Sequence, residues 1–402
     1  AMEIGVGASL AGVRALVAMK HVGLNVAMDP LMTFTYVGAI GGMVLINADD
    51  PSMHSSQNEQ DNRSLAKFAK CLLFEPADSQ EAYDMVTAGF ELSEKYQVPV
   101  IVRTTTRTAH TSTLVDIGSG ERGEAPAIPY VKNAQRNVAV PAHGRLMRFA
   151  VEKRSAALRE LTETTPFNRA EPGTGDLGIV ASGVAYQYAK EVFPEAPVFK
   201  VGLSCPPPIG KIRAFAAGVK RLVVVEESDP VLAEQIRAAG ITVVEPKTEL
   251  RMMELNPARL AALRAELLGT PAPEAPKPEA GIPVRPPVLC SGCSHRGPFH
   301  ILSKLKATVC GDIGCYTLGS APPLSAMDTC ICMGAAIGAA IGMRKAGLPN
   351  RRIAAVMGDS TFFHSGMTGL LDVAYNKIPI TVMVFDNRIT AMTGHQENPG
   401  SG

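Results

Sequence analysis

Short apolar runs alternate with amphipathic stretches along most of the chain, and this alternation predicts an α/β fold. Near the end, Ile353–Met357 is entirely apolar and Ile380–Phe385 is largely so, whereas Thr361–Asn376 between them carries apolar residues at helical spacing. Two strands joined by a helix form a β-α-β unit, in which both strands run parallel in one sheet. We therefore predict neighbouring parallel strands whose carboxyl ends lie at the same edge of that sheet.

Two earlier regions show the same alternation. In the first, Met43–Ile46 and Val98–Val102 are predicted strands and Asp78–Lys95 is a predicted helix. In the second, strands are predicted at 179–180, 198–201, 222–225 and 241–244, with helices that end near 192, 219 and 239. A charged helix predicted at Arg145–Thr164 is interpreted as a solvated element. The predicted fold class is α/β, with three doubly wound domains and mainly parallel sheets.

Composition suggests where these units begin and end. Residues 1–116 form the first unit, 117–177 a connecting segment with a loop-like stretch at 121–129, and 178–267 a second α/β unit. Prolines crowd residues 268–287, where neither a helix nor a central strand can continue, so this stretch is predicted to be an extended linker. Residues 288–402 form the last unit.

Charge and composition fit an enzyme better than a nucleic-acid-binding or membrane protein. The 402 residues carry a formal net charge of +1, and 46% of them are hydrophobic, which is enough for several buried cores. The most membrane-like stretch, 330–343, is too short to span a bilayer, and no secretory signal is visible. The cysteines lack the dense spacing of a secreted disulfide scaffold. We expect a cytoplasmic protein that binds no nucleic acid and no membrane.

Polar residues follow both predicted strands of the last unit. Gly358-Asp359-Ser360 comes after the first strand, and Asp386-Asn387-Arg388-Ile389 comes after the second. Ligands of open α/β sheets bind at the carboxyl ends of the strands. The carboxylate of Asp359, the amide oxygen of Asn387 and the main-chain carbonyl of Ile389 are hard oxygen ligands suited to Mg²⁺. The spacing predicts a magnesium site that holds a diphosphate, and the alternative is two ordinary strand-to-helix turns.

Five separated segments then resemble one enzyme family. They are KHVGLN at 20–25, DDPSMHSSQNEQD at 49–61, CSGCSHRG at 290–297, GDIGCYTLG at 311–319 and DNRITAMTGHQ at 386–396. Together with the diphosphate-binding pattern, they resemble the large (alpha) subunit of indolepyruvate ferredoxin oxidoreductase, within the thiamine diphosphate-dependent 2-oxoacid ferredoxin oxidoreductases. The resemblance covers nearly the whole chain.

This resemblance implies an oxidoreductase that decarboxylates aryl 2-oxoacids such as indolepyruvate, forms an aryl-acetyl-CoA and reduces ferredoxin. Its cofactors would be thiamine diphosphate and Mg²⁺, with 4Fe–4S clusters in the full-length protein. Its partners would be a smaller beta subunit, ferredoxin, CoA and the arylpyruvate. Residues 1–116 would form the pyrimidine-binding domain, 178–267 a transketolase C-terminal-like domain and 288–402 the diphosphate-binding domain. By the same resemblance the sequence is a fragment that lacks both ends and is inactive by itself.

The resemblance also implies which residues surround the cofactor. Asp359, Asn387 and Ile389 match the family's metal ligands, whereas Ser360 replaces a glycine and Asp386 replaces an asparagine. The turn after a predicted strand at 307–310 adds main-chain N–H groups that can face an anion, unless it is a plain tight turn. The expected cofactor-binding residues are Gly358, Asp359, Ser360, Asn387, Ile389, Thr390, Met392, Asp312, Gly314 and Cys315.

Catalytic and substrate-binding residues are expected in two polar clusters of the first unit. The catalytic candidates are His54, Glu59 and His21, and the substrate-binding candidates are Lys20, Asn25, Gln57 and Asn58. A structural role is the alternative for each histidine. The family's glutamate that hydrogen-bonds the pyrimidine ring would precede Ala1, and Glu3 does not match its position.

Three alternatives stay open at this point. Cys290 and Cys293, with Cys310 or Cys315, could bind an iron–sulfur cluster or zinc. Reduced thiols in a tight turn beside the cofactor, with His295 and Arg296, are the simpler interpretation. A non-oxidative thiamine diphosphate-dependent decarboxylase or ligase could use the same scaffold. A nucleotide-sensing or scaffolding α/β protein without catalysis is the third.

Overall fold

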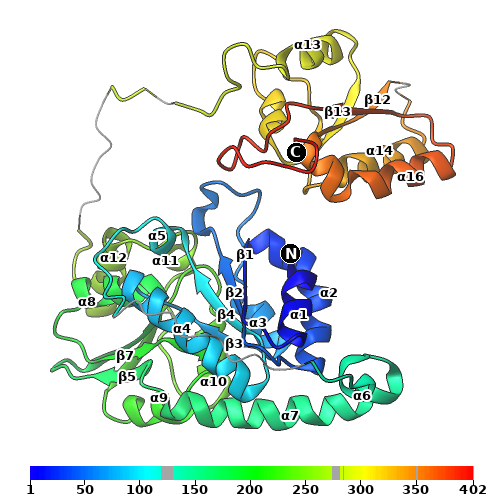
Figure 1. Cartoon of the computed structure of the whole chain (residues 1–402). Helices are drawn as coiled ribbons and strands as arrows, with labels where there is room; N and C mark the ends of the chain where they lie inside the picture. The colour runs from blue at the N-terminus through cyan, green and yellow to red at the C-terminus, as the bar shows by residue number, and fades with distance from the viewer. Residues whose placement is uncertain (119–129, 274–280, 284, 350–351, 402) are drawn as a thin grey trace. The chain divides into compact units, whose positions relative to one another are not determined.

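The protein forms two compact units, Ala1–Pro276 (unit 1) and Lys277–Gly402 (unit 2), coloured blue to green and yellow to red in Figure 1. The structure, a computed structural model, describes residues 1–118, 130–273, 281–283, 285–349 and 352–401. The predicted loop at 121–129 and, within the predicted linker, residues 274–280 and 284 lie outside the described residues. Across the described ranges, no helix is both long and apolar enough to traverse a lipid bilayer.

The first sheet of unit 1 has the strand order β1-β2-β4-β3-β8. Its strands are β1 (Ala15–Lys20), β2 (Met43–Ala48), β3 (Leu72–Phe74), β4 (Val100–Thr104) and β8 (Leu203–Cys205). β1 to β4 pair in parallel, and β8 runs antiparallel to β3. The strands predicted at 43–46 and 98–102 are β2 and β4. Both are mostly apolar because helices cover the two faces of the sheet.

Helices pack on both faces of this first sheet. One face carries α1 (Met2–Leu10), α2 (His21–Val37) and α3 (Arg63–Ala69), and the other carries α4 (Ser79–Tyr96) and α7 (Pro141–Thr164). Two short helices, α5 (Thr106–Ala109) and α6 (Ala134–Asn137), lie in the connections. α4 begins after Asp78, whose carboxylate accepts the Glu81 N–H at 2.9 Å and caps the helix. α7 buries Met147, Val151 and Leu158, so the helix predicted at 145–164 is amphipathic rather than fully solvated.

The second sheet of unit 1 has the strand order β5-β7-β6-β9. Its strands are β5 (Asn168–Glu171), β6 (Leu177–Ser182), β7 (Val198–Val201) and β9 (Arg221–Val225). Helices α8 (Gly183–Val192) and α12 (Pro257–Leu268) cover one face, and α9 (Ile209–Ala216) and α10 (Val231–Ala238) cover the other. β6, β7 and β9 are parallel, and β5 is antiparallel to β7. The three predicted strands at 179–180, 198–201 and 222–225 are confirmed.

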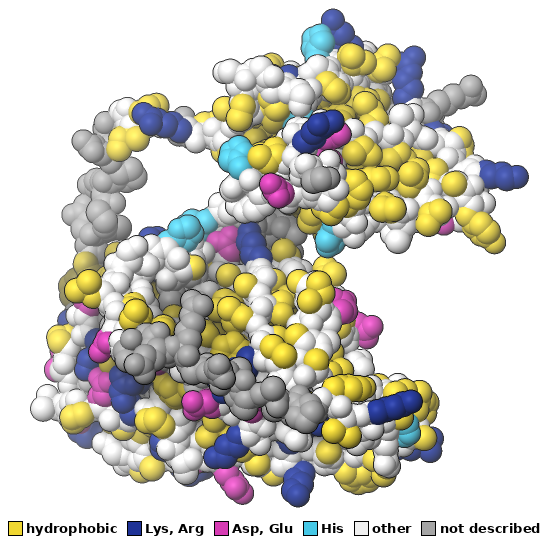
Figure 2. Space-filling model, in the orientation of Figure 1, with side chains coloured by type: hydrophobic (Ala, Val, Ile, Leu, Met, Phe, Trp, Pro, Cys, Tyr) yellow, Lys and Arg dark blue, Asp and Glu magenta, His cyan; other side chains and the backbone are white. Residues whose placement is uncertain are grey.

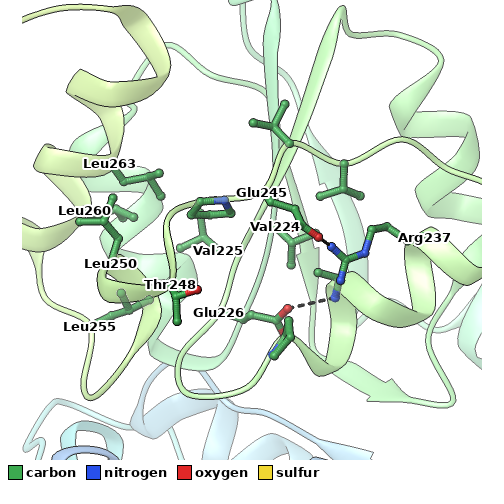
Figure 3. A pocket seen from close by; sticks show the side chains of 15 residues that line it. Val224, Val225, Glu226, Arg237, Glu245, Thr248, Leu250, Leu255, Leu260 and Leu263 are labelled. Carbon is green, nitrogen blue, oxygen red and sulfur yellow. Dashed lines mark hydrogen bonds and ion pairs between the residues drawn. The ribbon is translucent and has the colours of Figure 1, made fainter.

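The strand predicted at Ile241–Val244 is wrong. Val244 makes a single bridge to Val223, and the next element is the short helix α11 (Thr248–Arg251). A pocket remains between the end of β9 and the helices that follow it (Figure 3).

This pocket beside β9 offers little to a polar ligand. Glu226 accepts the N–H groups of Leu232 and Ala233 at 2.9 Å each, and Glu245 pairs with Arg237. Most of the remaining wall is aliphatic. Since both carboxylates are already engaged, the pocket is interpreted as a gap at the edge of the sheet.

A buried ionic network joins the two sheets of unit 1. Arg63, at the start of α3, donates to Asp61 and, at 2.7 Å, to Glu226 at the end of β9. Arg103, on β4, donates to Asp49 at 2.6 Å and to Glu75 at 2.9 Å. All of these side chains are buried. Because breaking one partner of a buried ion pair is strongly destabilising, the network fixes the two sheets together.

Residues 1–116 and 178–267 therefore fold within one compact unit. β8 was not predicted as a strand. Its residues lie within 178–267, yet it completes the first sheet by pairing with β3. The domain limits derived from the sequence stay predictions. The fold class is confirmed, since each of the three sheets is mainly parallel and has helices on both faces.

The sheet of unit 2 is parallel throughout, with the strand order β11-β10-β12-β13. Its strands are β10 (Thr308–Gly311), β11 (Thr329–Cys330), β12 (Ile353–Gly358) and β13 (Thr381–Phe385). Helix α13 (Arg296–Lys304) covers one face and α14 (Ala335–Lys345) covers the other. The strands predicted at 307–310, 353–357 and 380–385 are confirmed.

The helix predicted at 361–376 is interrupted. It consists of α15 (Asp359–Thr361), a π turn at Phe362–Gly366 and α16 (Met367–Tyr375). No residue of α16 is buried, and Leu371 and Tyr375 are 70% and 86% exposed. Figure 2 shows apolar side chains gathered over this part of unit 2.

Glu227, directly after β9, is expected to make stability depend on pH. Burial raises its pKa to about 7 from an ordinary 4.5, although Leu255 N–H donates to it. Because the folded-state pKa is the higher one, stability falls as pH rises from about 4.5 to about 7, by at most ~3 kcal/mol. Glu227→Gln keeps the acceptor, so we expect a larger free energy of unfolding at pH 8 and little change at pH 5, measured by denaturant titration.

The exposed Glu195, which pairs with Arg264 at 2.8 Å, provides the control. Glu195→Gln should change the free energy of unfolding by less than about 1 kcal/mol at either pH, because exposed ion pairs contribute little. A Glu227→Gln effect of equal size at pH 5 and pH 8 would contradict the prediction.

Candidate functional site

A pocket in unit 2 opens where β10, β12 and β13 end. The register pairs Gly358 with Phe385, so the residues that follow them leave the sheet at the same edge. The cavity volume of this pocket is about 60 Å³. The predicted cofactor residues that line it are Gly314, Cys315, Gly358, Asp359, Ser360, Asn387, Ile389, Thr390 and Met392. The structure thus brings together residues that are far apart in the sequence.

Asp359 is the buried acid of this pocket. It begins α15 directly after β12, and it is 6% exposed. Its Oδ1 accepts the Ser360 N–H at 2.7 Å, whereas Oδ2 is buried and has no hydrogen-bond partner among the described residues. A buried carboxylate oxygen without a donor is unfavourable unless a cation or another donor satisfies it. This oxygen therefore fits the role of a metal ligand.

A hydroxyl pair links the two loops that carry the predicted metal ligands. The side-chain oxygens of Ser360 and Thr390 lie 2.5 Å apart, so the loop after β12 is bonded to the loop after β13. Ser360 is the position that departs from the family's glycine, and its hydroxyl makes a bond that glycine could not. Asn387 is exposed, and its Oδ1 accepts the Ile389 N–H at 3.3 Å, which is a weak bond. The amide oxygen can therefore also approach a cation.

Tyr316, which the sequence analysis missed, forms the buried inner wall of the pocket. Its hydroxyl donates to the carboxylate of Asp312 and lies 2.9 Å from the hydroxyl of Thr361. Burial raises the pKa of Asp312 to about 6, opposed by hydrogen bonds from Tyr316 and from the Gly334 N–H. Asp312 does not line the pocket itself. It accepts the hydrogen bond that holds Tyr316, which does line the pocket.

Two glycines allow Tyr316 to pack here. A Cβ atom on Gly314 or Gly358 would lie 2.4 or 2.7 Å from the Tyr316 ring, which is too close for any side chain. The N–H of Gly314 donates to the hydroxyl of Thr317 at 3.1 Å. A side chain of the same turn thus satisfies this N–H. The expectation that main-chain N–H groups of the turn face an anion stays a prediction.

His295 also lines the pocket. It is 3% exposed, and its ring centroid lies 6.2 Å from that of Tyr316 and 5.3 Å from that of Phe385. Burial lowers the pKa of His295, and the negative charge of Asp359 partly opposes this. A mostly neutral imidazole thus lies near the buried carboxylate. The sequence analysis expected His295 beside the cofactor only as a neighbour of the thiols in the segment CSGCSHRG.

Cys290 and Cys293 lie in a tight turn. The Cys293 N–H donates to the Cys290 carbonyl at 3.2 Å, and Arg296 Nε donates to the same carbonyl at 3.0 Å. Burial raises the pKa of the Cys315 thiol, and Cys293 and Cys290 add to that shift. Within the described ranges, no three His, Cys, Asp or Glu side chains are arranged to hold a metal ion. The geometry agrees with the turn interpretation, and cluster binding stays a prediction.

In unit 1, Asp50 organises the loop between β2 and α3. The donors to its carboxylate are the N–H groups of His54 (3.2 Å) and Ser55 (2.9 Å) and the hydroxyls of Ser56 (2.5 Å) and Thr106 (2.8 Å). Burial alone would raise the pKa of Asp50, but these bonds and the Lys20 ammonium, 3.8 Å away, lower it to about 2. An ionised carboxylate therefore holds this loop in one shape.

Several predicted catalytic and substrate-binding residues meet at this loop. Lys20, at the end of β1, donates to the Ser55 carbonyl, and burial lowers its pKa. His54, Gln57 and Asn58 are exposed on the loop. The structure therefore brings Lys20 and His54 to the same polar surface.

The other candidates of unit 1 lie differently. Glu59 accepts the Ser52 N–H at 2.8 Å, which gives it a role in shaping the loop. His21 is fully buried, with both ring nitrogens unpartnered in the described part of the chain, so it does not join the exposed group. Asn25 is exposed on α2. The catalytic interpretation of His21 does not fit its burial, because a catalytic group must reach its substrate.

Sequence comparison finds related proteins over the whole chain. The family described as "Pyruvate flavodoxin/ferredoxin oxidoreductase, thiamine diP-bdg" matches residues 1–149, and "Thiamine pyrophosphate enzyme, C-terminal TPP binding domain" matches residues 312–402. The chain is 41% identical to the indolepyruvate oxidoreductase subunit IorA of Archaeoglobus fulgidus, over 100% of this chain and 67% of that protein. It is 42% identical to the IorA subunit of Pyrococcus abyssi and 40% identical to that of Methanothermobacter thermautotrophicus, each over 100% of this chain and 68% of the relative.

Among solved structures, a 2-oxoglutarate:ferredoxin oxidoreductase from Magnetococcus marinus matches with a TM-score of 0.48 and 20% identity, over 61% of this chain and 51% of that one.

We expect Asp359→Asn to weaken the binding of thiamine diphosphate with Mg²⁺ by at least about tenfold, or ~1.4 kcal/mol, because it removes the charge that faces the cation. Isothermal titration calorimetry measures this affinity directly. Asp372→Asn is the matched control, because Asp372 is exposed on α16 and does not line the pocket. Unchanged affinity for Asp359→Asn would exclude Asp359 as a ligand.

Proposed function

We propose, from the premise that this chain belongs to the family of the indolepyruvate oxidoreductase subunit IorA, that it acts as the large subunit of an arylpyruvate ferredoxin oxidoreductase. Members of the family are thiamine diphosphate-dependent oxidoreductases, as the two matching domain families describe. The proposed reaction is oxidative decarboxylation of an aryl 2-oxoacid such as indolepyruvate. The substrate and CoA yield an aryl-acetyl-CoA, carbon dioxide, a proton and a pair of electrons, which ferredoxin accepts.

The pocket of unit 2 is the observation that carries this proposal. Asp359 contributes a buried oxygen to which no described residue donates, and Asn387 and Ile389 line the same pocket. Thiamine diphosphate, when bound, supplies the carbanion chemistry by which a 2-oxoacid loses carbon dioxide. Asp359 Oδ2, Asn387 Oδ1 and the Ile389 carbonyl would hold Mg²⁺ against the diphosphate. The bond between Ser360 and Thr390 would keep the two loops at a constant separation.

Apolar residues of the same pocket would exclude water from the cofactor. Met392 lines the pocket and is 46% exposed, so its flexible side chain is available to cover a bound ring. Phe385 and Tyr316 form the buried side of the wall. A dry site strengthens the electrostatic contacts that orient a charged cofactor.

The polar surface of unit 1 would recognise the substrate. Lys20 is a cation suited to the 2-oxoacid carboxylate, and Gln57, Asn58 and Asn25 add exposed amides. His54 would hold or move a proton during the reaction, since histidine changes its charge near neutral pH. The structure describes each unit by itself, so this assignment depends on the family relation and on the exposure of these side chains.

Further partners follow from the same relation and stay proposals. The word subunit in the relatives' names implies a partner chain, which we propose to be a smaller beta subunit. Ferredoxin, CoA and 4Fe–4S clusters in the complete protein belong to the proposed reaction. Iron and acid-labile sulfide analysis of protein purified without oxygen measures the cluster content.

A non-oxidative decarboxylase would release an aldehyde instead of a thioester. The relatives are named oxidoreductases, which favours the oxidative reaction. We expect the complete enzyme, supplied with indolepyruvate, CoA and ferredoxin, to form indole-acetyl-CoA with reduction of ferredoxin. Mass spectrometry of the product, with ferredoxin absorbance, decides between the two reactions. Aldehyde without ferredoxin reduction would contradict the proposal.

His54→Ala in the complete enzyme should lower kcat/KM for indolepyruvate at least about tenfold, because general acid–base groups contribute on the order of a hundredfold or more. Steady-state kinetics measures the effect. His300→Ala provides the control, since His300 is exposed on α13 and does not line the cofactor pocket. A kcat/KM for His54→Ala equal to that of the control would remove His54 from the site.

A further inference from the structure

A buried carboxylate joins two exposed side chains on the surface of unit 1. The side chain of Glu254 is 8% exposed, whereas those of Arg107 and His54 are 54% and 45% exposed. Arg107 donates to the two oxygens of Glu254 through Nε at 2.6 Å and Nη2 at 2.7 Å. His54 Nε2 lies 3.3 Å from Glu254 Oε2. One carboxylate therefore holds a guanidinium and an imidazole at once.

The three residues come from distant parts of the sequence. His54 lies in the loop after β2, Arg107 in α5 after β4, and Glu254 between α11 and α12. A further hydrogen bond supports this contact, because the Glu254 N–H donates to the Ser52 hydroxyl at 2.8 Å. Sequence spacing could not have indicated the contact.

Strained backbone surrounds the contact on both sides. Ser52 and Met53 have φ angles of 67° and 52°, and Met253 has a φ angle of 65°. Residues other than glycine rarely adopt such left-handed conformations, and each costs on the order of 1–3 kcal/mol unless its surroundings impose it. Strain of this kind gathers at functional sites, where it sets the direction of a side chain.

We propose that Glu254 is the positioning residue of His54. A carboxylate only accepts hydrogen bonds, so the contact requires the proton of the neutral imidazole to be on Nε2. The lone pair is then on Nδ1, which accepts one proton in one step of a turnover and gives the same proton up in a later step, so the imidazole ends the cycle neutral. While Nδ1 holds this proton, the negative charge of Glu254 stabilises the positive charge of the imidazolium. Arg107 holds Glu254 by a two-point contact and keeps it in place.

This inference deepens the proposed function and rests on it. A purely structural clamp between the two sheets of unit 1 would also explain the contact, so the experiment must separate the two roles. A clamp affects the stability of the protein whether or not His54 is present. A positioning residue affects turnover only through His54.

Kinetics of the complete enzyme with indolepyruvate tests this difference. We expect Glu254→Gln to lower kcat at least about tenfold with a smaller change in KM, and the double variant Glu254→Gln/His54→Gln to be no slower than His54→Gln alone. Glu195→Gln, which breaks an exposed contact to Arg264, should leave kcat unchanged. Losses that multiply in the double variant would overturn the proposal.

Nuclear magnetic resonance of ¹⁵N-labelled histidine tests the geometry without turnover. We expect the Nε2–H tautomer for His54 in the unaltered protein and a mixture of tautomers in Glu254→Gln. An Nδ1–H tautomer, or no change in the variant, would overturn the proposal. If the unaltered enzyme does not act on aryl 2-oxoacids, the proposed function fails while this measurement still tests the contact.

The variant Glu254→Asp keeps the proposal testable if Glu254→Gln does not fold. Glu254→Asp keeps the charge but withdraws it by one methylene, so it should lower kcat less than Glu254→Gln and retain a majority of the Nε2–H tautomer. Circular dichroism verifies that each variant is folded. A loss of kcat in Glu254→Asp as large as that in Glu254→Gln, with the His54 tautomer unchanged, would contradict a positioning role.

Discussion

Parallel pairing of β12 with β13 is the constraint on which the candidate cofactor pocket depends. The register places Gly358 beside Phe385, so Asp359 and the loop that begins at Asp386 leave the sheet together. A slip of one residue would turn every following side chain to the opposite face. The hydroxyl bond between Ser360 and Thr390 then ties the loops just beyond the sheet. The register of these two strands therefore determines where the predicted metal ligands lie relative to one another.

The apolar core and the polar pocket of unit 2 share residues. Tyr316 and Phe385 belong to the buried cluster that packs α13 on the sheet, and both also line the pocket. The hydroxyl of Tyr316 donates to the buried Asp312, so packing and hydrogen bonding fix the same ring. Side chains that are locked in this way hold a site more rigidly than side chains on loops alone. The rigidity of the pocket therefore follows from the core beneath it.

Unit 1 differs from unit 2 because it contains two sheets, which must be held in one orientation relative to each other. Arg63 and Arg103 bind carboxylates from both sheets in a buried network, and β8 adds a strand from one region to the sheet of the other. The contact of Glu254 with His54 and Arg107 lies at the same junction of distant segments. The loop that carries His54 is thus shaped by Asp50 from within and by the second α/β region from outside.

The sequence alone determined the α/β class, the strands that flank the metal ligands and the family, because each depends on local periodicity or on short motifs. The strand predicted at 241–244 was wrong, and the helix predicted at 361–376 contains a π turn that was not foreseen. Apolar periodicity does not reveal which sheet edge accepts a further strand or where a helix widens into a π turn. Tyr316 was missed as a pocket residue, and the ring contacts of His295 were not foreseen, because both depend on rings that pack from distant segments. The partnerless oxygen of Asp359 and the contact of Glu254 with His54 exist only in three dimensions. Tertiary structure decided these features, because burial and the approach of distant segments are properties of the packed chain and not of residue order.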